Sequence, residues 1–341
     1  MFRTFTTVAL LVGCGVETDG VDPIAKIGGG CAPWECGTNS PQISAYGFHE
    51  LNLSGQPEPE SQFRLLDFKL AGNSYTLQVV NGRMIATNAG GAIFGQGLVG
   101  AYMLVGQSTV DTYAIQIQEV GTVAYWAGGG VKTIESYLLA YAPAPGGVPF
   151  PTFQNLCSNP PPRGSSESRN MDPTHALVFE GDRIDGFQKK EYGIDRSWFN
   201  IGCAGHTLAK MYLTGHVQAA EVDGFVTTQA ERTAIIKMFS ADYCGTGAAY
   251  TVSGMPLDYR DDLGWLAYPV PAPVSLEARW SETGATCVRS LRGDVDPTKD
   301  FSAAFPNGPR PQMTLDGCHP ATCRDNNPNL LGTAHLVSGN P

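Results

Sequence analysis

Residues 74–87, Ser-Tyr-Thr-Leu-Gln-Val-Val-Asn-Gly-Arg-Met-Ile-Ala-Thr, decide the fold of the first half of this chain. Apolar and polar side chains alternate on both sides of Asn81-Gly82, and an Asn-Gly pair between two such runs is a strong signal for a two-residue β-hairpin. Further β-prone runs, separated by turn residues, flank this hairpin at Arg64 to Leu70, Gly100 to Val105, Tyr113 to Glu119 and Ser136 to Tyr141. The pattern predicts an antiparallel β sandwich or barrel over residues 31–145.

The rest of the chain divides by composition. Residues 146–174 are rich in Pro, Gly and Ser, and predict a linker or long inter-domain loop. Residues 175–292 begin with an apolar strand and then show helical spacing, which predicts a second, α+β domain. Residues 293–341 carry scattered Pro, Asn and Gly, and predict a loop-rich C-terminal tail. The fold class expected for the whole chain is therefore α+β and β-rich.

Two helices are expected in the second domain. Thr228, followed three residues later by Glu231, forms a capping-box signal for a helix over residues 229–241, which has a clear apolar face. Apolar spacing predicts a preceding helix over residues 202–216. We expect the two helices to pack as an antiparallel hairpin.

The composition disfavours two classes of protein, nucleic-acid binders and proteins held by anionic lipid headgroups. The 341 residues include 22 Lys+Arg against 32 Asp+Glu, a formal net charge of −10, and only 16% are charged. An acidic chain lacks the basic face that a nucleic-acid partner requires, and it is not suited to binding anionic headgroups. The 41 Gly and 24 Pro are typical of a loop-rich exported protein. No cofactor is expected.

The N-terminus predicts export. Residues 1–13 combine the positive charge of Arg3 with a short apolar run, which is typical of a signal peptide. Leu11-Val12-Gly13-Cys14 resembles the bacterial lipobox, in which the cysteine is lipidated and becomes the mature N-terminus. The alternative is an ordinary apolar start with a chance cysteine. We expect a lipid anchor at Cys14, a flexible tether over residues 14–30, and a location at the bacterial cell envelope (outer membrane or cell surface) rather than the cytoplasm.

Eight cysteines remain after Cys14, an even number that predicts four disulfides in an exported protein. They allow 105 pairings. Two pairs that are close in the sequence, Cys31–Cys36 and Cys318–Cys323, are favoured because each would cross-link a segment with few core residues. Cys203–Cys244 is favoured because the start of the first helix should lie beside the end of the second. Elimination leaves one more, so the predicted pairs are Cys31–Cys36, Cys318–Cys323, Cys203–Cys244 and Cys157–Cys287. A zinc site built from Cys318, His319 and Cys323 is the disfavoured alternative, because its spacing is atypical, and no metal site is predicted.

An ordered set of motifs runs through the second domain: Trp198 to Lys210, Ala241-Asp242-Tyr243-Cys244-Gly245, Glu277 to Trp280 and Ala285 to Val288. Together they resemble the ADYC-domain family of exported bacterial proteins and lipoproteins. The resemblance covers most of residues 170–292 and, more loosely, the N-terminal β domain. It implies an envelope protein, and it implies no catalytic residue, ligand or activity.

The motif itself raises an enzymatic alternative. Cys244 with His206 as base and Asp242 nearby would suit a thiol hydrolase or a thiol-redox enzyme. The even cysteine count favours a disulfide instead. In that interpretation Ala241, Asp242, Tyr243 and Cys244 are structural, and Asp242 and Tyr243 fix the helix end by hydrogen bonds and packing.

Other patterns are weaker. Gly95-Gln96-Gly97-Leu98-Val99-Gly100 matches a dinucleotide fingerprint but precedes strand and turn signals rather than a helix. Two acidic groups could bind calcium although neither is an EF-hand loop: Asp258/Asp261/Asp262 and Asp294/Asp296/Asp300. Trp34 or Trp126 could stack on a sugar, although core packing is the expected role. No paired ligand spacing is present among His49, His175, His206, His216, His319 and His335.

The sequence therefore predicts an exported, membrane-anchored bacterial lipoprotein with a binding or structural role rather than a catalytic one. Its lipid anchor would partner a membrane, nucleic acid is not expected as a partner, and no particular protein or glycan ligand is indicated. The thiol enzyme is the main alternative, and a calcium- or glycan-binding module is the weaker one.

Overall fold

A computed structural model describes residues 41–43, 46–107, 111–127, 132–157, 170–218, 227–249, 257–261, 275–292, 318–324 and 336–340. The predicted signal peptide, Cys14, the tether and the Cys31–Cys36 pair lie outside these residues.

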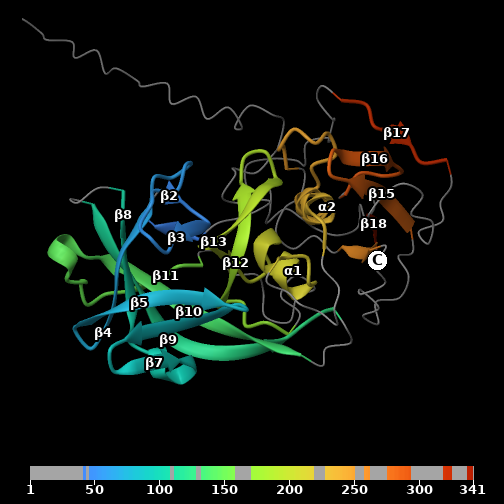
Figure 1. Ribbon diagram of the computed structural model, residues 1–341. Helices are drawn as coiled ribbons and strands as arrows, with labels where there is room; N and C mark the ends of the chain where they lie inside the picture. Colours follow the sequence, from blue (N-terminus) through green and yellow to red (C-terminus); the bar gives the residue numbers. More distant parts are fainter. Residues whose placement is uncertain are drawn as a thin grey trace, which may run out of the picture.

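An eleven-stranded, fully antiparallel sheet forms the larger part of the molecule (Figure 1). Its order is β3-β13-β12-β10-β9-β8-β4-β5-β6-β7, and β11 pairs with β10 off this path. The strands are β3 (Glu50–Asn52), β4 (Arg64–Leu70), β5 (Asn73–Val80), β6 (Arg83–Asn88), β7 (Gly91–Phe94), β8 (Tyr102–Gly106), β9 (Thr112–Ala124), β10 (Thr133–Pro143), β11 (Gln154–Asn155), β12 (Ala176–Asp185) and β13 (Lys190–Cys203). Short elements complete this region: the pair β1 (Gln42–Ile43) and β2 (Tyr46–Gly47), and the 3-10 turns η1 (Gly95–Leu98) and η3 (Pro145–Gly147).

The predicted hairpin at Asn81-Gly82 is confirmed as the β5–β6 turn. Both residues have positive φ, 52° and 69°, as the preferred two-residue hairpin turn requires. The turn docks on β12, where the backbone N–H groups of Asn81 and Gly82 donate to the carboxylate of Glu180 at 2.8 and 3.3 Å. A Cβ on Gly82 would lie 1.7 Å from the Tyr212 hydroxyl, so only glycine fits this approach. The hairpin thus brings the sheet back onto itself.

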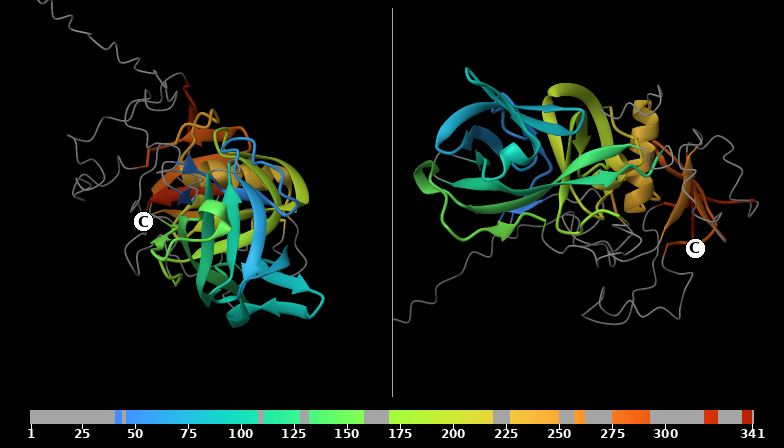
Figure 2. Two further views of the ribbon diagram at one scale, coloured as in Figure 1. Left: turned by 90° about the vertical axis from the view of Figure 1, so that its left-hand side faces the viewer. Right: turned by 90° about the horizontal axis from the view of Figure 1, so that it is seen from below.

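The β12–β13 hairpin separates two hydrophobic cores. Successive side chains of a strand point to opposite faces. Leu177 and Phe179 therefore pack on the helix side, while Val178 and Ile201 pack into the core enclosed by the curled sheet. Figure 2 shows the helices lying between the large sheet and a second, smaller one.

The helical predictions hold with one change of length. α2 (Gln229–Ser240) begins at the predicted capping box, with Thr228 and Glu231 each accepting from the other's backbone N–H. α1 (Thr207–Leu213) is shorter than expected, because Gly202 and Cys203 still belong to β13 and Gly205 has a φ of +81°. The two helices contact each other, and the α+β, β-rich fold class is confirmed.

The smaller sheet contains β14 (Asp258–Asp261), β15 (Ser275–Ser281), β16 (Gly284–Val288), β17 (Ala321–Thr322) and β18 (Leu336–Asn340). Its order is β14-β18-β15-β16-β17, so a strand from the last residues of the chain lies between two earlier ones. The segment 293–341, expected to be loop-rich, therefore supplies β17 and a central strand. β18 has the sequence Leu-Val-Ser-Gly-Asn, whose weak strand signal is overridden by pairing on both sides.

The large sheet contains strands from both sides of the predicted linker at 146–174. β12 and β13 follow this segment, and they pair with β10 and β3, respectively, which precede it. The domain boundaries themselves stay a prediction.

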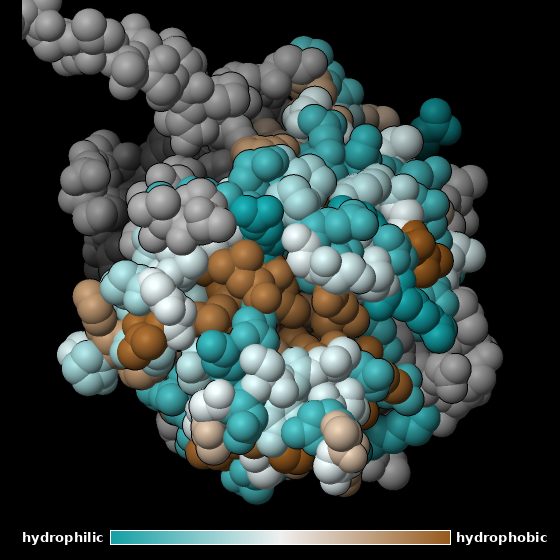
Figure 3. Space-filling view, turned by 60° about the vertical axis from the view of Figure 1, so that its left-hand side comes forward, coloured by the Kyte–Doolittle hydropathy of each residue, from teal (hydrophilic) through white to brown (hydrophobic). Residues whose placement is uncertain are grey.

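Within the described ranges, no helix combines the length and the apolar character needed to cross a membrane. On the side where the large sheet lies, apolar side chains line a hollow bordered by polar ones (Figure 3).

The predicted disulfides among the described residues are wrong. The observed pairs are Cys157–Cys203, Cys244–Cys318 and Cys287–Cys323, with Cα–Cα distances of 5.5, 5.7 and 5.0 Å. Cys203–Cys244 fails because Cys203 is the last residue of β13 and faces the enclosed core, on the other side of the sheet from the helices. Cys157–Cys287 fails with it, because Cys157 lies in the same core as Cys203. Cys318–Cys323 fails because each of these cysteines reaches a different neighbouring segment.

Candidate functional site

The Ala-Asp-Tyr-Cys segment forms the turn that ends α2. Ala241 is fully buried and adopts the left-handed conformation (φ 53°, ψ 40°), and its N–H donates to the carbonyls of Lys237 and Met238. The N–H of Asp242 donates to the Lys237 carbonyl at 2.8 Å. Glycine is the usual residue at such a helix end. Alanine here adds a methyl group to the core at a conformational cost of about 1 kcal/mol.

The carboxylate of Asp242 holds the turn together from inside. It is fully buried and accepts the backbone N–H groups of Thr246 (3.0 Å) and Gly247 (2.9 Å). The ammonium of Lys237, one turn back on α2, lies 2.8 Å from its second oxygen. With two N–H donors and an ammonium, this carboxylate has the complete partner set that a buried charge needs.

Two glycines allow the turn to pack so closely. Gly245 has a φ of +68°, and a Cβ there would lie 2.0 Å from the Thr283 carbonyl. Gly247 has a φ of +91°, and a Cβ there would lie 1.8 Å from the Phe187 carbonyl. The turn therefore contacts both the β15–β16 hairpin and the tip of β12–β13.

Tyr243 connects the turn to the smaller sheet. Its hydroxyl donates to Glu277 Oε1 and accepts the backbone N–H of Arg292, both at 2.6 Å, and all three residues are at most 2% exposed. Arg292 in turn faces the Glu277 carboxylate and donates to the carbonyls of Met238 (2.7 Å) and Phe239 (3.1 Å), which caps the end of α2. Burial and the negative charge of Glu277 raise the pKa of Tyr243 well above its ordinary value. The phenol is therefore a neutral hydrogen-bonding group.

Cys244 completes the motif through its disulfide to Cys318. A sulfur held in a disulfide is not a nucleophile. His206 is the N-cap residue of α1, and Asp242 is committed to the turn, so the proposed thiol, base and carboxylate do not form a catalytic set. Asp242 and Tyr243 hold the end of α2 through these hydrogen bonds, which are the contacts that the structural interpretation expects.

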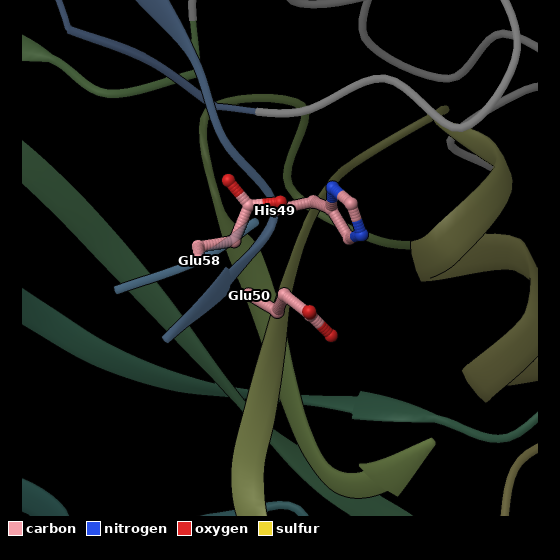
Figure 4. A group of neighbouring side chains, drawn as sticks. All are labelled: His49, Glu50 and Glu58. Carbon is pink, nitrogen blue, oxygen red and sulfur yellow. The ribbon is translucent and has the colours of Figure 1, made fainter. Parts of the chain in front are cut away.

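A buried group of His49, Glu50 and Glu58 offers a different candidate. Each residue provides a potential ligand atom within 4.8 Å of the other two, and none is more than 2% exposed. Figure 4 shows that the carboxylates of Glu50 and Glu58 point in different directions. The sequence carries no recognised motif for this group, because His49 directly precedes β3, Glu50 is its first residue and Glu58 lies in the loop that follows.

The partners of this group describe an internal ion network rather than an open metal site. His49 Nε2 faces the Ile184 carbonyl at 2.8 Å and so must carry the proton there. Both oxygens of Glu50 accept from the guanidinium of Arg183, at 2.9 to 3.2 Å. Burial alone would lower the pKa of His49, but the charges of Glu50, Glu60 and Glu58 outweigh it and raise the pKa. A protonated His49 would supply the positive charge that these carboxylates require.

A second ion network lies beneath α2. Arg232 pairs with two buried carboxylates, Asp182 (3.0 Å) and Glu191 (Nη2–Oε1 2.9 Å). Burial and the charge of Glu191 raise the pKa of Asp182 to about 7, although Arg232 opposes the shift. The backbone N–H of Gln218 also donates to Asp182, at 2.9 Å. The network joins α2 to the β12–β13 hairpin.

The other candidate residues from the sequence analysis lie in the core, in a short turn and beside a buried histidine. Trp126 is 2% exposed in the core and donates to the Asn170 side chain, as core packing predicts. Gly95–Leu98 forms η1 and leads to a strand, which removes the helix that a dinucleotide site needs. Asp261 lies 3.7 Å from His216 Nε2.

Cys318 and Cys323 are both in disulfides and so are not thiolate ligands. The calcium candidates Asp262, Asp294, Asp296 and Asp300 lie outside the described residues, as do Trp34 and His335.

Comparison with family models matches residues 95–294 to the ADYC domain. No curated protein and no solved structure matches the chain. The matched range contains both helices, the Ala-Asp-Tyr-Cys turn and the β15–β16 hairpin that the turn contacts.

Proposed function

Because the chain belongs to the ADYC-domain family, we propose that it is an exported, lipid-anchored protein of the bacterial cell envelope with a structural or binding role. In this proposal the Ala-Asp-Tyr-Cys motif is a structural joint and not an active site. One observation carries it: Cys244 is in a disulfide, while the buried Asp242 and Tyr243 have complete internal partner sets.

The joint connects three parts of the fold. Asp242 closes the turn after α2, Tyr243 binds Glu277 on β15, and Cys244 binds the segment around Cys318. A covalent bond, a buried ion pair and a buried hydrogen-bond triad thus meet within three consecutive residues. A joint that includes a disulfide suits a protein of an oxidising compartment, where such bonds persist.

Export is supported by the signal-peptide pattern of residues 1–13 and by the disulfides, which persist in oxidising compartments. The test is metabolic labelling with an alkyne fatty acid in a bacterial host, followed by membrane fractionation. We expect label and membrane association for the natural chain, and loss of both for Cys14→Ser. Membrane association that survives Cys14→Ser would refute the anchor.

The structural role of the motif has a separate test. Thiols are counted on denatured, unreduced Cys14→Ser protein prepared in an oxidising compartment. We expect no alkylation at Cys244 before reduction. A free thiol that maps to Cys244 would overturn the structural interpretation.

A binding role draws on the apolar hollow of Figure 3. Contiguous exposed apolar surface is uncommon on soluble proteins and often marks an interaction site. The probe is 1-anilinonaphthalene-8-sulfonate, added to folded protein. We expect fluorescence that rises with probe concentration and saturates. A signal no greater than that of a folded control protein would refute binding at the hollow, and only the structural role would remain.

A further inference from the structure

The disulfides of the C-terminal part cross one another along the chain. Their cysteines occur in the order 244, 287, 318, 323, but Cys244 pairs with Cys318 and Cys287 with Cys323. Cys157 and Cys203, by contrast, are bonded to each other as consecutive cysteines. Pairing in order of appearance would therefore make one correct bond and two wrong ones.

Chain entropy favours the non-native Cys318–Cys323 bond, and once that bond has formed Cys244 and Cys287 are left to pair with each other. The native partners are 74 and 36 residues apart, whereas Cys318 and Cys323 are five apart (323 − 318). Loop closure becomes less probable roughly as the 3/2 power of loop length. The local Cys318–Cys323 bond is thus favoured by roughly 60-fold over Cys244–Cys318 and roughly 20-fold over Cys287–Cys323 in an unfolded chain.

A Cys318–Cys323 bond excludes both native bonds of the folded segment. Residues 318–324 are held at one end by Cys318, at the turn after α2, and at the other end by Cys323, beside β16. Between them β17 pairs with β16 through Cys287↔Ala321 and Val288↔Thr322. A Cys318–Cys323 bond removes both covalent attachments at once, so that segment 318–324 depends on the two-residue β17 ladder and on the hydrogen bond from the Cys323 N–H to the Val288 carbonyl (3.2 Å).

We propose that this chain is a substrate of a thiol–disulfide isomerase, which converts Cys244–Cys287 and Cys318–Cys323 bonds to the native pairs. The isomerase thiolate attacks Cys318, forms a mixed disulfide and releases the Cys323 thiolate. That thiolate attacks Cys287 and releases the Cys244 thiolate, which attacks Cys318 and expels the isomerase thiolate. Two disulfides enter and two leave, so the exchange needs no net oxidant.

The cellular setting of this exchange rests on the export proposed above, but the pairing problem rests on the connectivity alone. The experiment is therefore done in solution. Reduced, denatured Cys14→Ser protein is refolded in a glutathione redox buffer, alkylated at intervals and mapped by mass spectrometry of its disulfide-linked peptides. Parallel samples contain catalytic amounts of a purified disulfide isomerase, or the same isomerase with its active-site cysteines replaced by serine.

We expect the Cys318–Cys323 peptide to dominate early, and its conversion to the native pairs to be several-fold faster with active isomerase only. The double variant Cys244→Ser, Cys318→Ser removes the crossing, and the isomerase should accelerate formation of its Cys287–Cys323 bond several-fold less than it accelerates formation of the native pairs in the parent protein. The measured quantity is the amount of one disulfide-linked peptide, so the experiment does not require the variant to fold fully. Direct formation of the native pairs, or conversion that the isomerase does not accelerate, would overturn the proposal.

Discussion

Replacing Tyr243 by Phe removes a single hydroxyl from the centre of the joint. In the natural chain that oxygen donates to Glu277 Oε1 and accepts from the Arg292 backbone N–H, at 2.6 Å in each case. The ring packs against Trp280, with ring centroids 5.1 Å apart, and phenylalanine keeps this contact. The substitution therefore isolates the two hydrogen bonds.

The expected loss follows from the burial of the partners. A hydrogen bond to an ionised carboxylate contributes about 1.5–3 kcal/mol, and an N–H left buried without a partner costs about 1–3 kcal/mol. The carboxylate of Glu277 keeps Arg292, which limits the damage on that side. We expect the free energy of unfolding to fall by about 3 kcal/mol, more than a hundredfold in the folding equilibrium.

The measurement is equilibrium unfolding in urea with the disulfides intact. Tyr192→Phe is the matched control, because the Tyr192 ring is 45% exposed and its hydroxyl lies 3.4 Å from Glu50 Oε1. This control should lose less than about 0.5 kcal/mol. Equal losses for the two variants, or a loss below about 0.5 kcal/mol for Tyr243→Phe, would contradict the role assigned to the motif tyrosine.

Three other outcomes are expected. Thr228→Ala should lower the free energy of unfolding by about 1 kcal/mol, measured in urea, because the capping box at the start of α2 is removed; no change would mean that α2 is held by packing alone. Folding raises the pKa of Asp182 to about 7, so its carboxyl favours the folded state at low pH and this contribution is lost as the pH rises through 7. The stability of the natural chain relative to Asp182→Asn should therefore fall by up to about 4 kcal/mol between pH 4 and 8, and a flat or rising difference would refute the shift. Micromolar zinc should leave the unfolding midpoint unchanged, because His49 Nε2 and the Glu50 carboxylate already have partners; a rise that His49→Ala abolishes would identify a metal site.

The candidate site could be predicted from the sequence only in part. The motif residues and the capping box were visible because each lies in a short segment with a recognisable pattern. The partners of the motif were not visible: Glu277, Arg292 and Cys318 lie 34, 49 and 74 residues away from the residues that they bind. Local spacing carries no information on which of many polar residues will meet across the interior.

The sequence alone determined the elements whose signals are local. The alternation around Asn81-Gly82 specifies a hairpin, and Thr228 with Glu231 specifies the start of α2, because neighbouring residues there satisfy one another's backbone groups. Only the tertiary structure decided the disulfide partners. Cys203 lies next to the first helix in sequence, but strand alternation directs its side chain to the opposite face of the sheet, where Cys157 lies. The face that a strand turns toward the core depends on what packs on each side, and that is a property of the whole chain.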